Sequence, residues 1–171
     1  MTFLELAKSR YSVRAYKPDP IEEEKLNLIL EAGRVAPTAC NYQPQRVYVV
    51  RSEENRNKLA AISPCTFDAP VILVVCYDTD RHAKSRMMPG YTFGEMDASI
   101  VCTHMMLQAW ELGIGSCWVG MFNDAEVSKA LELPDNIHVA ALLPMGYPAE
   151  TAKPAHLHAK IRTFDDTIAY L

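Results

Sequence analysis

Two arginines and a serine near the start of the chain have types and spacing that suggest binding chemistry. Arg10, Ser12 and Arg14 occupy alternate positions. Alternate side chains of an extended segment point to one side, so two guanidinium groups and a hydroxyl would converge there. Because a guanidinium donates paired hydrogen bonds to oxyanions, the pattern predicts a cradle for a phosphate or carboxylate. A solvated basic edge explains the same spacing, and the pattern alone leaves both readings open.

The stretch from Ala36 to Gln45 is a second candidate site. It combines small residues, two prolines and side-chain amides, including Asn41 and Gln43. Such a composition makes a rigid loop that can approach a flat ligand closely. The amides offer both donors and acceptors, which suits a ring edge carrying C=O and N–H groups. Taken alone, a loop of this composition is usually a turn.

Glycines at positions 113, 115 and 120 form a third cluster, in the segment that reaches Asn123. They follow a predicted helix and precede a predicted strand. A dinucleotide-binding fingerprint requires the reverse order, so the Rossmann interpretation is excluded.

A fourth group lies near the end of the chain. The predicted last strand runs into Gly146-Tyr147-Pro148, and Lys160 and Arg162 follow at alternate positions. These two cations either complete an anion site or lie in water.

Capping and hydrophobic patterns predict the elements that must position these groups. Thr2 followed by Glu5 is a capping box, which begins a short helix to about Lys8. An acidic run from Glu22 begins a second helix that stops before Pro37. Further helices are expected at about 52–62, 94–112 and from 123 to before 134, and strands at 47–50, 70–76, 116–121 and 137–146.

Three further segments have a length or an apolar surface that the core of one chain does not explain. The helix at 94–112 is apolar over more than one face, so it should be central or pressed against a second subunit. Residues 78–93 are too long for a tight connection and form either a lid over a binding site or an ordered surface loop. The tail from Lys153 to Leu171 ends in apolar residues without an obvious partner, and it is expected to pack on another chain.

Composition sets limits on the function. The chain has 171 residues, 49% of them hydrophobic, which suffices for one α/β or α+β domain spanning 1–171. A formal charge of −4 argues against a nucleic-acid partner. Apolar runs of about eight residues and the lack of a signal peptide favour a cytoplasmic protein with no membrane partner. Five dispersed cysteines and the His156–His158 pair do not suggest a metal site.

Taken in order and at these separations, the segments resemble the FMN-dependent nitroreductase family over nearly the whole chain. The shared parts are Arg-x-Ser-x-Arg, Ala-Pro-Thr-x-x-Asn-x-Gln-Pro before a strand, Gly-Ile-Gly-Ser after an apolar helix, Gly-Tyr-Pro and the late Lys-x-Arg. The resemblance implies a three-layer α+β fold with a central mixed sheet flanked by helices, in an intertwined homodimer. It also implies two FMN sites at the dimer interface.

The resemblance assigns roles to three sets of residues. Arg10, Ser12, Lys160 and Arg162 match positions that hold the FMN phosphate and ribityl chain, and Arg14 matches the cation beside the flavin N1 and O2 edge. Residues matching the segment past the flavin N5 face are Val119, Gly120 and Met121. Residues matching those presented by the other subunit are Pro37, Thr38, Ala39, Asn41 and Gln43.

The implied activity is electron transfer from NAD(P)H to a nitroaromatic, quinone or similar acceptor in a ping-pong cycle. The cofactor carries this chemistry, which accords with the absence of a recognisable catalytic triad. Gln45 departs from the family, since many relatives carry Trp there, and this leaves the substrate open. Two alternatives remain: a non-catalytic flavin or small-anion binding protein, and a cysteine hydrolase that uses Cys40 with a histidine.

Overall fold

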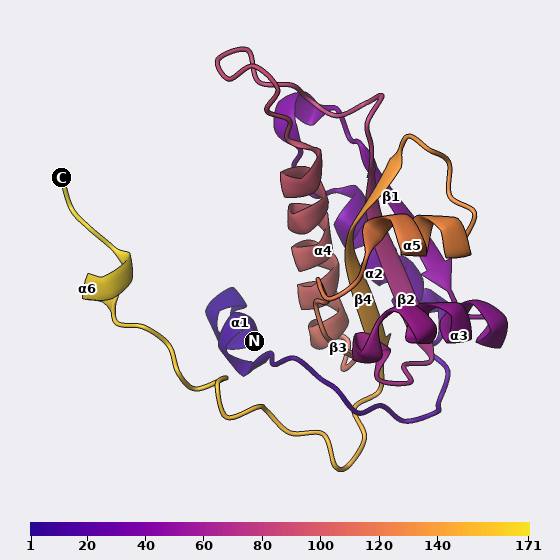
Figure 1. Cartoon of the computed structure of the whole chain (residues 1–171). Helices are drawn as coiled ribbons and strands as arrows, with labels where there is room; N and C mark the ends of the chain where they lie inside the picture. The colour runs from indigo at the N-terminus through magenta and orange to yellow at the C-terminus, as the bar shows by residue number, and fades with distance from the viewer.

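The elements fall where the sequence patterns place most of them. The computed structural model describes all 171 residues (Figure 1). Its helices are α1 (Phe3–Ser9), α2 (Glu23–Arg34), α3 (Glu53–Ile62), α4 (Gly94–Glu111), α5 (Asp124–Ala130) and α6 (Phe164–Thr167), with 3-10 turns η1 (Ala39–Asn41) and η2 (Pro64–Thr66); its strands are β1 (Gln45–Val50), β2 (Val71–Asp78), β3 (Gly115–Ser116) and β4 (Ile137–Gly146).

Local capping determines where several helices begin. At α1 the Thr2 hydroxyl accepts a hydrogen bond from the Glu5 N–H, and the Glu5 carboxylate accepts one from the Thr2 N–H. The predicted capping box is therefore confirmed. Ser52 and Asn123 likewise accept backbone hydrogen bonds at the starts of α3 and α5. At the other end of α4, Gly113 adopts a φ of 77°, a conformation that glycine reaches without steric cost.

The four strands form one sheet with helices on both faces. Their order is β1-β2-β4-β3, and every paired neighbour is antiparallel. Along β2 the odd-numbered side chains at 71–75 pack in the cluster that contains α2 and α4. The even-numbered side chains at 72–76 pack in the cluster that contains α3 and α5. The predicted α+β class and three layers are confirmed, and the parallel part of the expected mixed sheet is one bridge between Ser12 and Ser116.

A bulge in β4 shifts the alternation of its side chains between the two faces of the sheet. Val75 pairs with Ala141 while Cys76 pairs with Val139, so Ala140 is an extra residue in β4. Before the bulge, Val139 faces the α3 and α5 layer. After it, Ala141 and the following odd-numbered positions face α2 and α4.

The strand predicted at 116–121 is much shorter than expected. β3 ends at Ser116, and beyond it only Val119 makes an isolated bridge, with Leu142. Cys117 donates its N–H to the Pro144 carbonyl, but Pro144 has no N–H to return a bond. The ladder is interrupted at this proline.

The C-terminal tail leaves the body of the molecule. Every residue from Lys153 to Leu171 is exposed, and the segment with α6 extends away from the sheet and its helices (Figure 1). Its apolar side chains belong to neither of the two hydrophobic clusters of the chain. None of the helices in the structure has the length and hydropathy needed to cross a membrane.

Replacing Leu73 by Ala should strongly destabilise the fold. Leu73 is fully buried at the centre of β2, so Leu73→Ala removes buried apolar surface and leaves a cavity. We expect a loss of about 3 kcal/mol in the free energy of unfolding, measured by chemical denaturation. Val49, the residue of β1 that pairs with Leu73, is 36% exposed. Val49→Ala should therefore lower the free energy of unfolding by less than about 1 kcal/mol. Equal losses in the two variants would contradict this packing.

Candidate functional site

The predicted anion cradle lies on an extended segment at the end of the sheet. Residue 12 bridges residue 116 of β3, and the Val13 N–H donates to the Ser116 carbonyl over 3.0 Å. Val13 is fully buried and packs against Gly115, where a Cβ would lie 2.6 Å from a Val13 methyl. Because Val13 points into the core, its neighbours Ser12 and Arg14 point to the opposite side.

The cradle side chains influence the thiol of Cys117, the residue that follows β3. Burial raises the pKa of the Cys117 thiol, while Arg14, a hydrogen bond from Ser12 and the charge of Arg10 all act to lower it. Convergence of these three side chains on one bound anion stays a prediction. The Arg14 guanidinium also donates to the Ser12 carbonyl over 3.1 Å.

The predicted segment 119–121 continues from this sulfur along the open edge of β4. Val119 is buried and exchanges two backbone hydrogen bonds with Leu142. Gly120 and Met121 are exposed, and the Met121 sulfur lies 3.9 Å from the Cys65 sulfur. Cys65 also acts electrostatically on Cys117, as Arg14 and Arg10 do.

The predicted loop at 37–43 has an unusual backbone. Cys40, Asn41 and Gln43 adopt φ values of 54°, 54° and 49°, a region that costs free energy for residues other than glycine. Internal bonds support the loop: the Gln43 N–H donates to the Thr38 hydroxyl, and the Gln43 amide donates to the Asn41 side-chain oxygen, each over 3.0 Å. With Pro37 and Asn41 exposed, the loop presents polar groups outward.

These two candidate sites lie at opposite ends of the sheet in one chain. The loop enters β1 at Gln45, which pairs with Tyr77 at the end of β2. The cradle joins β3 at Ser116, and β3 pairs with Met145 and Gly146 beside the start of β2. Helix α4 spans the same distance with 18 residues, about 27 Å at 1.5 Å per residue. A single chain therefore keeps the loop and the cradle about the length of α4 apart.

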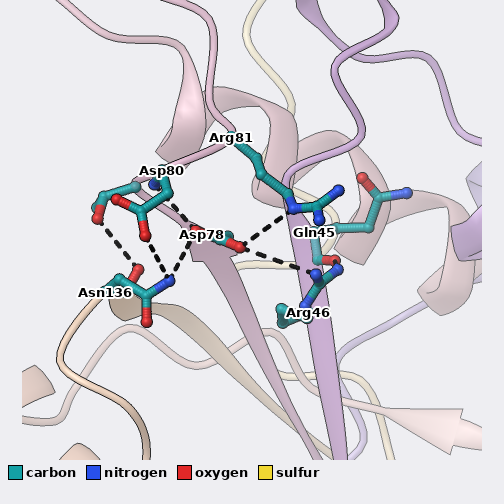
Figure 2. A network of polar contacts seen from close by, with 7 residues as sticks. Gln45, Arg46, Asp78, Asp80, Arg81 and Asn136 are labelled. Carbon is teal, nitrogen blue, oxygen red and sulfur yellow. Dashed lines mark hydrogen bonds and ion pairs between the residues drawn. The ribbon is translucent and has the colours of Figure 1, made fainter.

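A network of polar contacts holds the end of the sheet at which the loop enters (Figure 2). Asp78 is buried, and its carboxylate accepts from the Asn136 amide over 2.9 Å. Arg46 and Arg81 lie 3.7 and 3.6 Å from its other oxygen. The network ties β1, the end of β2 and the turn before β4 together, and so fixes the exit of the 37–43 loop.

Residues 78–93 form an ordered hairpin-like connection that projects past the N-terminal end of α4 (Figure 1). Lys84 bridges Thr92, and the Ser85 N–H donates to the Tyr91 carbonyl over 2.9 Å. At the base of the connection, the Phe93 N–H donates to the Ala83 carbonyl over 3.0 Å. A role for this connection over an active site stays a prediction.

The predicted cations of the tail are exposed. Tyr11 meets the tail at two points, because its hydroxyl donates to the Ala152 carbonyl over 3.5 Å and its ring lies 6.2 Å from the His158 ring. The tail thus passes the cradle segment just before Lys160 and Arg162. No hydrogen bond joins either cation to the cradle, so their shared role stays a prediction.

Asp97 is a polar residue that the sequence patterns did not single out. It is 2% exposed on the most apolar helix, and its carboxylate accepts from the Ala39 N–H in the 37–43 loop over 2.8 Å. Because acidic residues are common in the first turn of a helix, nothing in the sequence marked Asp97 as unusual. The cysteine hydrolase alternative gains nothing, since Cys40 is exposed and hydrogen-bonds no histidine.

Comparison with known proteins gives a family. A family model described as the nitroreductase family matches residues 7–64 and 60–147. Among curated relatives, the FMN reductase (NAD(P)H) of Bacillus subtilis is 30% identical, over 81% of this chain and 63% of its own length. The match includes both the cradle and the 37–43 loop.

Solved structures are similar over almost the whole chain. A nitroreductase family protein from Clostridium difficile 630 superposes with a TM-score of 0.92 at 38% identity, over 99% of this chain and 98% of that one. A nitroreductase with bound FMN from Bacteroides fragilis superposes with a TM-score of 0.76 at 28% identity, over 98% and 97% of the two chains.

Proposed function

Because the chain belongs to the nitroreductase family, we propose that it is an FMN-dependent oxidoreductase that transfers electrons from NAD(P)H to a nitroaromatic, quinone or similar conjugated acceptor. The observation that carries this proposal is the pairing of the segment that contains Arg10, Ser12 and Arg14 with Ser116, directly before residues 117–121.

The donor set of this segment fits FMN. Two guanidinium groups and a hydroxyl match a phosphate, which requires several hydrogen-bond donors and positive charge. The adjoining segment has an exposed glycine at 120, and the exposed, polarizable Met121 suits contact with a flat aromatic ring. Arg10 and Ser12 would hold the phosphate and ribityl end, Arg14 would lie beside the N1 and O2 edge of the ring, and residues 119–121 would lie along the ring.

A second copy of the chain would complete the site. Within one chain, the 37–43 loop and the cradle lie about the length of α4 apart. Exposed apolar side chains on α1 and α2, including Phe3, Leu28 and Val35, surround an open hollow of about 530 Å³ beside α4. The apolar side chains of the tail also belong to neither hydrophobic cluster of the chain. We therefore propose a homodimer in which Pro37, Thr38, Ala39, Asn41 and Gln43 serve the partner's cradle, and Lys160 and Arg162 add charge at the phosphate.

Bound FMN supplies hydride acceptance and electron transfer, so the chain needs no nucleophile of its own. Its side chains bind and orient. Arg14 would also stabilise negative charge at the ring edge, by an amount of order 1 kcal/mol that depends on solvent access. Burial raises the pKa of Cys117, which keeps this thiol protonated beside the proposed phosphate and avoids a second negative charge there.

Steady-state oxidation of NADH and NADPH with menadione or a nitroaromatic tests the activity. We expect turnover that depends on added FMN, with parallel double-reciprocal plots, because donor and acceptor would use one pocket in turn. A yellow protein without turnover with either donor would instead support the non-catalytic flavin-binding alternative. A colourless protein that takes up no FMN would contradict both.

A further inference from the structure

A buried carboxylate links the 37–43 loop to the connection at 78–93. Asp97 lies in the first turn of α4 and is 2% exposed. Burial raises the pKa of its carboxyl, while the bond from Ala39 and the charge of His82 act in the opposite direction. A buried carboxylate costs free energy unless it is hydrogen-bonded, so its contacts indicate what it does.

Two hydrogen bonds meet at this residue, and a third lies next to them at Phe93. The Ala39 N–H donates to the Asp97 side chain over 2.8 Å. The Asp97 N–H donates to the Phe93 carbonyl over 2.8 Å, and the Phe93 N–H donates to the Ala83 carbonyl over 3.0 Å. Asp97 is therefore bonded directly to the loop and, through Phe93, to both ends of the 83–93 hairpin.

The loop depends on this contact more than on any other outside itself. Its remaining hydrogen bonds are internal or come from its own helix, while the backbone at Cys40, Asn41 and Gln43 is left-handed. Such a backbone persists only where surrounding contacts hold it. The Ala39–Asp97 bond is the one hydrogen bond that joins residues 37–43 to a distant part of the chain.

Two polar atoms at this junction have no hydrogen-bond partner. One is the second carboxylate oxygen of Asp97, and the other is Nδ1 of His82, in the 78–93 connection. Because the charge of His82 affects the pKa of Asp97, the two groups are close enough to interact. One oxygen of Asp97 thus bonds to the loop, and the other is buried without a hydrogen-bond partner.

We propose that Asp97 is a positioning residue that sets the 37–43 loop in the conformation that contacts the flavin ring in the partner's site. This inference rests on the proposed function. It gives Asp97 a role at the ring end of the cofactor, separate from the phosphate end that Arg10 contacts.

Flavin affinities of matched variants test the proposal. We expect Asp97→Ala to bind FMN and riboflavin about tenfold less tightly than wild type, by the same factor for both, because the ring end is common to the two ligands. Asp97→Asn keeps an oxygen acceptor and should stay within about threefold of wild type. Fluorescence quenching of the two flavins measures these affinities without turnover.

A control separates this role from stability alone. Asp124 accepts a backbone hydrogen bond of the same 2.8 Å length, from Val139, on the opposite layer of the fold. Asp124→Ala should lower the melting temperature and leave both flavin affinities unchanged. If Asp97→Ala lowers only the melting temperature, the proposal is wrong.

A second variant removes the other partner of the bond. Ala39→Pro deletes the N–H at the first position of a helical turn, after Thr38 with its extended backbone, so proline fits there. Its effect and that of Asp97→Ala should not add in the double variant; additive effects would overturn the proposal. Failure of wild type to bind any flavin would instead refute the proposed function.

Discussion

Truncation after Ala152 is expected to yield a folded monomer that binds FMN at least about a hundredfold less tightly than the full chain. The removed residues are all exposed and contact the body chiefly through the His158 ring at Tyr11. They carry Lys160, Arg162 and the apolar residues proposed to dock on a second copy. Losing two charge-assisted phosphate contacts alone accounts for such a factor, at roughly 1.5–3 kcal/mol each. Sedimentation and flavin titration would measure the two effects.

Point variants separate the proposed role of the tail in dimerisation from its proposed role in FMN binding. Lys160→Ala together with Arg162→Ala should keep the dimer and weaken FMN binding, because the apolar side chains remain. Should the truncated protein stay dimeric with full FMN affinity, the tail has neither role.

Replacing Arg10 by Ala is expected to weaken FMN binding about ten- to a hundredfold. One charge-assisted contact to a phosphate contributes roughly 1.5–3 kcal/mol. Riboflavin lacks the phosphate, so its affinity should not change, and the preference for FMN over riboflavin should fall by the same factor. Titration of apoprotein with each flavin measures both values.

Arg51 offers the matched control for this variant. It forms an exposed ion pair with Glu23 and follows β1, the edge strand on the opposite side of the sheet from β3, beside which the cradle segment lies. Arg51→Ala should leave the affinity for FMN unchanged. Undiminished flavin retention in Arg10→Ala would remove the main support for the cradle.

Local signals in the sequence predicted most of the elements. The capping residues Thr2, Ser52 and Asn123 each bond within three or four positions, so the pattern and the bond lie in the same few residues. The apolar run before Asp78 indicated a strand buried on both faces, and β2 is buried along nearly its full length. The strand predicted at 116–121 failed because its partner, Pro144, is distant in sequence.

Some features of the candidate site were likewise predictable from neighbouring residues, and others depend on residues far apart in the sequence. Alternation of Arg10, Ser12 and Arg14 in an extended segment is a local property, and the bridge from Ser12 to Ser116 agrees with an extended backbone there. Asp97 could not be found this way, because its partner Ala39 is 58 positions away. The Asp78 network could not be predicted for the same reason, because Asn136 is also 58 positions from Asp78.

The sequence by itself determined the helices, the central strand, the anion-binding pattern and the family resemblance, because each depends on neighbours within a few residues or on motifs read in order. Only the tertiary structure decided that the cradle and the 37–43 loop lie at opposite ends of one sheet, that Ala140 turns β4 between layers and that Asp97 supports the loop. These features arise from strand register and from side chains that meet across the fold. Their energies depend on pairs of residues that no local pattern brings together.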